Sequence, residues 1–263
     1  MKLTGAIPSP PDERDRDFAF HKTEKFAGAF TGTRTSVDVT DLHTWRVQPA
    51  NSCVEYAIAE QCQALGVAEG RPLDLLGVAR FYALTRLRTE APVPSAGIPD
   101  TGSSQRYAYA VAREDGIQSE DVWPDSSSIA TLVPPARVWE AAPLIKLGTC
   151  HRIFGEGDVD ALRDGIITAL TLARDGKCSP PTTLMQVDDA YGALPEDEVY
   201  SAPGGNVWGW HCQMALAYLA DLDAVALASS WSKRRFLVSV PWLAANGGET
   251  WVVDSILRQG SLL

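Results

Sequence analysis

Cys53 is the residue of this sequence with the clearest potential for chemistry. It stands at the start of a segment, 52–65, in which apolar side chains recur at spacings of three and four, as the buried face of a helix requires. Unpaired backbone N–H groups and the helix dipole stabilise negative charge at a helix start, so we expect Cys53 to have a depressed pKa and to act as a nucleophile. A cysteine is more often a small buried hydrophobic residue. The helix-start position, Gln48 shortly upstream and a histidine far downstream favour the catalytic interpretation.

His211 is the histidine best placed to serve as a base toward that thiol. It follows a glycine-rich stretch, 204–209, and opens an apolar run typical of a strand, so we expect its ring to project from the mouth of a strand into a cleft. The other histidines, His21, His43 and His151, stand in the amino-terminal arm or among polar residues, and we expect them at the surface.

The remaining cysteines predict neither a metal centre nor a disulfide framework. The chain has five cysteines and no C-x-x-C pair, a pattern that favours reduced thiols and disfavours structural zinc. Cys62 falls on the apolar side of the predicted helix, and Cys212 should point to the opposite face of its strand from its neighbour His211. Cys150 and Cys178 could pair in an oxidising compartment, but no pattern places them together. We expect no metal and no cofactor.

The elements that would position these residues divide the chain into a helical half and a β half. Helical periodicity recurs at 73–88 and 103–113, after the 52–65 helix, with Asn51 or Ser52 as the cap of the latter. Short apolar runs between turn residues then predict strands at 143–147, 166–172, 213–219, 224–228, 236–240 and 251–256, with one helical stretch at 158–164.

This order predicts an α+β protein whose cleft lies between the two layers. Residues 1–36 form an extended arm, and residues 37–263 form the domain, helical over about 37–133 and β over about 134–263. Residues 174–207, with four prolines, predict a long irregular loop. We expect its acidic clusters, at 188–189 and 196–198, to form a solvated face rather than a carboxylate pair of a hydrolase.

Composition excludes several classes of function. The chain has 263 residues, 45% of them hydrophobic, which suffices for a full core. Its net charge of −10 would repel a phosphate backbone, so we expect no nucleic-acid partner. No apolar run approaches the roughly 18 residues that span a bilayer, and the first 18 residues lack the apolar core of a signal peptide. We therefore expect a protein that is cytoplasmic as synthesised, with no membrane contact.

Nine short motifs, in order, resemble the papain-like cysteine peptidases, most closely their compact bacterial and phage-type members without a long propeptide. They are GAIPSPPDERD (5–15), VDVTD (37–41), QPANSC (48–53), FYALTR (81–86), DTG (100–102), GIQSEDVWP (116–124), ALRDGIIT (161–168), GWH (209–211) and SSW (229–231). The resemblance implies a helical half packed on an antiparallel β half, and a thiol hydrolase that cleaves peptide bonds of peptides or proteins.

By that resemblance Cys53 would form the acyl-enzyme, with His211 as general base and acid. Gln48 would donate to the oxyanion, and Ser229 would occupy the position that orients the histidine. Cys53 and His211 lie 158 positions apart, near the roughly 130–150 expected of this family. The long 174–207 loop would absorb the excess.

Two tryptophans are candidates for substrate binding. Trp208 and Trp210 flank the expected cleft and could grip an extended peptide, although ordinary core and rim packing is the alternative.

Four features depart from the family pattern. Ser229 replaces the usual asparagine, and Gln48 precedes Cys53 by five positions rather than six. Val54 replaces an aromatic residue, and Lys233-Arg234-Arg235 replaces a Trp-Gly shield. These changes leave a second hypothesis open: a catalytically degenerate relative that serves, through protein partners, as a structural or interaction component of a larger assembly such as a phage particle.

Overall fold

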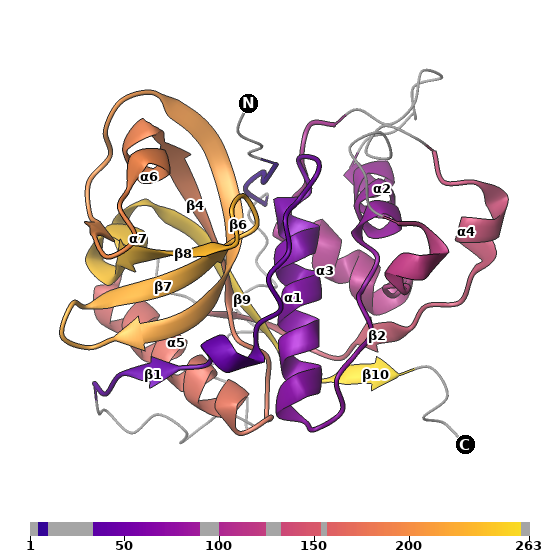
Figure 1. Cartoon of the computed structure of the whole chain (residues 1–263), viewed down its shortest axis with the longest axis horizontal. Helices are drawn as coiled ribbons and strands as arrows, with labels where there is room; N and C mark the ends of the chain where they lie inside the picture. Colours follow the sequence, from indigo (N-terminus) through magenta and orange to yellow (C-terminus); the bar gives the residue numbers. More distant parts are fainter. Residues whose placement is uncertain (1–4, 10–33, 90–99, 125–132, 154–156, 259–263) are drawn as a thin grey trace.

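A group of helices and a mostly antiparallel sheet form the two halves of the molecule (Figure 1). This computed structural model describes residues 5–9, 34–89, 100–124, 133–153 and 157–258. His21, most of the predicted arm and the last five residues lie outside the described residues. The helices are η3 (Thr40–Leu42), α1 (Cys53–Ala68), α2 (Val78–Thr89), α3 (Gln105–Glu114), η4 (Glu120–Val122), α4 (Ala136–Glu140), α5 (Val159–Arg174), α6 (Asp189–Ala193) and α7 (Val240–Asn246).

The larger sheet has the strand order β3-β9-β4-β6-β7-β8-β5, and β1 also pairs with β6. Its pairings are antiparallel except for the short parallel pair of β5 with β8. A second, two-stranded sheet joins β10 to β2. The strands are β1 (Val37–Asp38), β2 (Ile145–Leu147), β3 (Cys150–Ile153), β4 (Thr182–Asp188), β5 (Val199–Tyr200), β6 (Val207–Leu219), β7 (Ala224–Ser229), β8 (Arg234–Ser239), β9 (Gly247–Val253) and β10 (Ile256–Arg258). The predicted α+β class is confirmed.

Helix α1 is the element through which the two halves meet. It lies alongside β6 (Figure 1), and side chains on every side of it are buried from Cys53 to Gly66. Leu184 of β4 and Cys212 of β6 pack with α1 in one core cluster. A second core cluster fills the other side of the sheet, beneath α5 and α7. The nucleophile candidate therefore begins a helix that is held between the remaining helices and the sheet.

The three helices predicted in the first half are confirmed. Ser52 takes the cap position of α1 without a side-chain hydrogen bond to the helix, whereas the Ser104 hydroxyl accepts one from the Tyr107 N–H at the start of α3. The Ser104 cap satisfies a backbone donor that the first turn of α3 leaves unpaired.

The strand predicted at 166–172 is wrong, because those residues continue α5. The Asp158 carboxylate caps this helix by accepting from the Ala161 N–H at 3.0 Å. Ile166, Ile167 and Leu170 are buried between the helix and the sheet. A helix buried on so wide a face has nearly continuous apolar residues, which a short window cannot distinguish from a buried strand.

The long irregular loop predicted at 174–207 is also wrong. It contains β4, which pairs with both β6 and β9 inside the larger sheet, and the short helix α6. A strand buried on both faces loses the alternation of polar and apolar residues by which strands are recognised. Asp188 is buried rather than solvated, and its carboxylate accepts from the Tyr191 N–H and the Tyr200 hydroxyl.

Candidate active site

Cys53 is the first residue of α1, and its side chain is fully buried. Burial raises the pKa of its thiol to about 12, although hydrogen bonds from the backbone of Cys212 and Gly5 act in the opposite direction. The depressed pKa expected from the helix start is therefore wrong for this state, because the cost of desolvating a thiolate exceeds the stabilisation from the helix start. In this state Cys53 is a neutral thiol at neutral pH.

His211 lies in β6, where it pairs with Met185 of β4. Its ring is buried and stacks on the indole of Trp231, with ring centroids 4.1 Å apart and planes 19° from parallel. Neither ring nitrogen has a hydrogen-bond partner among the described residues. Burial lowers the pKa of His211 to about 3, so the imidazole is neutral at neutral pH.

The structure brings the elements that carry Cys53 and His211 together. The Cys53 thiol contacts the backbone of Cys212, the residue after His211. The Cys212 side chain packs in the α1 cluster, and its sulfur accepts from Gln105 Nε2 at 3.2 Å. The His211 ring stacks on Trp231, which packs against the other core cluster, so the two side chains lie on opposite faces of β6, as predicted. The site is thus a neutral thiol beside the strand that carries a neutral imidazole.

Ser229 and Gln48 make other contacts than the sequence predicts. The Ser229 hydroxyl accepts from the Trp231 N–H at 3.2 Å, and no hydrogen bond joins it to His211. A serine side chain is shorter than that of asparagine. The Ser229 hydroxyl therefore forms a hydrogen bond within its own turn and does not reach the His211 ring. Gln48 Nε2 donates to the Ala50 carbonyl at 2.8 Å, and Gln48 Oε1 accepts from the Ser230 hydroxyl.

An amino-terminal segment, residues 5–9, occupies the place where the two halves meet (Figure 1). The Ala6 N–H donates to the carbonyl of Trp210, the residue before His211, at 3.2 Å. On the helical side, the Ser103 N–H donates to the Gly5 carbonyl at 2.6 Å, and the Ile7 N–H donates to the Ser103 carbonyl at 2.7 Å. An extended peptide therefore bridges α1's half and β6 directly over the site.

No protein-family model and no curated protein matches the chain, but its structure is similar to solved cysteine proteases. Xylellain, a cysteine protease of Xylella fastidiosa, matches with a TM-score of 0.73 and 18% identity over 97% of each chain. The procathepsin B of Trypanosoma congolense matches with a TM-score of 0.63 and 12% identity, over 98% of this chain and 87% of that one. The Carica candamarcensis protease CMS1MS2, solved with E-64, matches with a TM-score of 0.58 and 14% identity, over 83% and 96%.

The fold is papain-like. The structural similarity to xylellain spans 97% of the chain, and it agrees with the family that the sequence motifs resemble.

Within the papain-like fold, Trp208 and Trp210 lie on different sides of β6. The Trp208 indole N–H donates to Asp189 Oδ1 at 2.6 Å, and its ring lies against Trp231, with centroids 6.0 Å apart. Trp210 packs with the α1 cluster and offers its carbonyl to Ala6. Trp208 thus supports the ring that stacks on His211, while Trp210 touches the bound segment through its backbone.

Two histidines expected at the surface have buried side chains. His43 Nε2 lies 3.2 Å from Glu60 Oε2, and His151 Nε2 lies 3.8 Å from Asp254 Oδ2. The polar sequence around them indicated exposure, but their carboxylate partners allow burial. All five cysteines are buried and none forms a disulfide, and within the described ranges no cluster of three His, Cys, Asp or Glu side chains could hold a metal ion.

Glu55 is a site residue that the sequence reasoning did not single out. It is completely buried two positions after Cys53, and burial raises its pKa to about 7 against the lowering effect of Ser103, Thr85 and Arg86. Its charge would also raise the pKa of Cys53. Helical periodicity places Glu55 on the exposed face. The signal in the sequence that could have predicted its burial is the low charge of α1, because only two of the sixteen residues of this helix are charged, Glu55 and Glu60.

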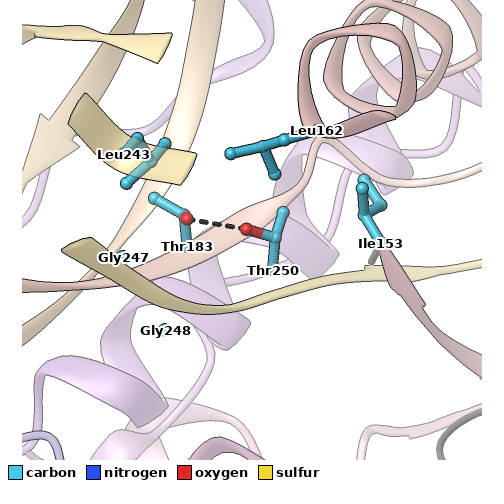
Figure 2. A pocket seen from close by; sticks show the side chains of 7 residues that line it. All are labelled: Ile153, Leu162, Thr183, Leu243, Gly247, Gly248 and Thr250. Carbon is cyan, nitrogen blue, oxygen red and sulfur yellow. Dashed lines mark hydrogen bonds between the residues drawn. The ribbon is translucent and has the colours of Figure 1, made fainter. Parts of the chain in front are cut away.

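A small cavity of about 10 Å³ lies elsewhere, on the side of the sheet that α5 and α7 cover (Figure 2). The hydroxyls of Thr183 and Thr250 are hydrogen-bonded to each other at 2.8 Å within it. The rest of its lining is apolar or glycine: Ile153, Leu162, Leu243, Gly247 and Gly248. Its lining residues offer no ionisable side chain for chemistry.

None of the described helices is long and apolar enough to cross a membrane.

Proposed function

We propose that the chain is a cysteine peptidase in which Cys53 attacks a peptide carbonyl and His211 transfers the protons. The supporting observation is the peptide segment 5–9, which already lies extended between the two halves of a papain-like fold, against α1 and β6. A peptide or protein substrate would pair with the same backbone groups of Ser103 and Trp210. Trp208 and Trp210 would contact it from the β half.

While segment 5–9 covers the site, Cys53 and His211 are both neutral, because burial favours the uncharged form of each. As the Cys53 sulfur forms a bond to the substrate carbonyl carbon, its proton passes to the imidazole of His211. The imidazolium then gives that proton to the leaving amine as the C–N bond breaks. His211 next takes a proton from water, which attacks the thioester carbon, and the proton returns to the departing sulfur.

The oxyanion formed on the way would accept a hydrogen bond from the backbone N–H of Cys53. Gln48 would contribute only after its Nε2 turns away from the Ala50 carbonyl, which now accepts its hydrogen bond. Ring stacking on Trp231 would orient His211 in place of a hydrogen bond from Ser229.

The test is cleavage of an unfolded protein substrate by the full chain and two cysteine variants. Cys53→Ala should abolish cleavage, because no acyl-enzyme can form. Cys62→Ala is the matched control, since Cys62 is equally buried on the same helix, and it should keep the activity of a folded chain. Equal activity of Cys53→Ala and the parent chain would refute the proposal.

The burial of both groups also favours a second candidate, a catalytically inactive papain-like protein that binds partners in an assembly such as a phage particle. In that case Cys53 would react with a thiol-reactive epoxide no faster than Cys62 or Cys150, and Cys53→Ala would leave partner binding intact. Size-exclusion chromatography of the chain from its source would then show a larger complex.

A further inference from the structure

Segment 5–9 is most tightly enclosed at Gly5, where backbone groups of the chain lie on both sides of it. A Cβ built on Gly5 would overlap the carbonyl group of Asn51, just before α1. From the other side, a Cβ built on Gly102 would overlap the Gly5 carbonyl, and Gly102 has a φ of +89°, which favours glycine. Both walls are backbone, so neither can move aside as the end of a flexible side chain would.

The restriction applies to that one position of the segment. Ala6 is buried in the α1 cluster, where a small side chain fits. Ile7 is 42% exposed, and Pro8 is also exposed, so the cleft places little demand on either. Ser9 is held through its backbone N–H, which donates to Glu249 Oε1 at 2.6 Å.

We propose that the cleft selects extended peptides with glycine at the position that passes between Asn51 and Gly102, followed by a small residue, and that Gly5-Ala6 of the chain's own segment is bound there as such a peptide. This inference rests on the proposed peptidase function and names its substrate class. It also means that the segment must leave before another peptide can bind.

The first experiment measures access to Cys53 by alkylation with iodoacetamide, located by mass spectrometry. In the full-length Gly5→Ala variant the added methyl group should expel the segment, and alkylation of Cys53 should accelerate at least tenfold. The matched control is Ile7→Ala, whose side chain is exposed, and it should react at the parent rate. A Gly5→Ala chain that reacts as slowly as the parent would overturn the proposal.

The second experiment adds peptides to the Gly5→Ala chain. The peptide LTGAIPS should protect Cys53 from alkylation, whereas LTAAIPS at the same concentration should not. Equal protection by both peptides, or protection by neither, would overturn the proposal. Should Gly5→Ala fail to fold by circular dichroism, Ala6→Glu expels the segment through a different residue and allows the same comparison.

Protection and cleavage are separate readouts. Protection by the glycine peptide without hydrolysis would support glycine selection while refuting the peptidase function. Hydrolysis of both peptides at equal rates would support the function and refute the selection.

Discussion

At the scale of single residues, burial controls the ionisation of this site. Cys53, Glu55 and His211 are all removed from water, and burial favours the neutral form of each. A thiolate–imidazolium pair is therefore absent while the segment covers the site. Departure of the segment would hydrate the cleft and so reduce the cost of desolvating the charged forms of these residues.

Glu55 should make stability depend on pH. Its pKa of about 7 in the folded chain exceeds the ordinary 4.5, so between those values the folded chain holds a proton that the unfolded chain has released. Stability from this residue is complete below about pH 4.5 and is lost as the pH rises to 7. Glu55→Gln cannot titrate, so it should be more stable than the parent at pH 8, by about 3 kcal/mol at most, and nearly equal at pH 4.5.

Urea unfolding at the two pH values measures this difference. Glu140→Gln, at an exposed position, controls for the loss of one carboxylate and should change little. A Glu55→Gln chain that is less stable than the parent at pH 8 would show that a charged Glu55 stabilises the fold.

Trp231 should be a positioning residue for His211, because its indole stacks on an imidazole that has no hydrogen-bond partner among the residues the structure describes. An aromatic pair of this kind contributes about 0.5–1.5 kcal/mol, and about 1.4 kcal/mol corresponds to a tenfold change in rate. We expect Trp231→Ala to lower kcat about tenfold with little change in KM, and Trp231→Phe to recover most of it. A loss confined to KM would place Trp231 in substrate binding instead.

At the scale of elements, the sequence predicts those whose pattern is local. The helix at 52–65 and the strands at 213–219, 224–228 and 236–240 follow from periodicity and turn residues, and the structure contains them. β4 escapes prediction because it is buried on both faces, and most of α5 escapes it because its buried face is wide enough to make 166–170 a continuous buried run.

The candidate site shows the same division. The sequence predicts Cys53 and His211 as site residues from their positions at the start of a helix and at the start of an apolar strand-like run. The structure brings the helix and the strand together. Other features of the site depend on contacts between distant segments, which no local pattern encodes. These features are the hydrogen bonds of Ser229 and Gln48, the role of Trp231 and the burial of Glu55.

Gln61 should control how firmly α1 is held on the sheet. Its Nε2 donates to the carbonyls of Pro180 at 2.8 Å and Trp251 at 3.0 Å, and its Oε1 accepts from the Tyr109 hydroxyl at 2.9 Å. Gln61→Leu leaves these buried groups without that partner, and we expect it to lower the free energy of unfolding by about 2 kcal/mol.

Gln63→Leu is the matched control, because Gln63 is buried on the same helix and its side-chain oxygen has no hydrogen-bond partner within the described part of the chain. Chemical denaturation should show little loss for this variant. If both variants lose the same stability, the cost comes from reshaping α1 and not from the hydrogen bonds of Gln61.

At the scale of the whole molecule, segment 5–9 connects the two halves. It pairs with Ser103 on the helical side and with Trp210 and Glu249 on the β side. Apart from the buried Gly5 and Ala6, hydrogen bonds rather than core packing hold this short segment within the described residues, and such a segment opens at a lower free energy than the core. Opening of the segment and unfolding of the molecule should therefore be separable.

Glu249→Gln should favour the open state. The carboxylate accepts from the Ser9 N–H, and hydrogen bonds to a charged acceptor are roughly twice as strong as neutral ones. We expect the amides of Ala6 and Ile7 to exchange hydrogen about five to ten times faster in the variant, from a loss of roughly 1 kcal/mol. The amides of β7, which do not contact the segment, should keep their rate and serve as the internal control. If both sets accelerated by the same factor, exchange of the segment would require global unfolding, and the cleft could not open while the fold remains intact.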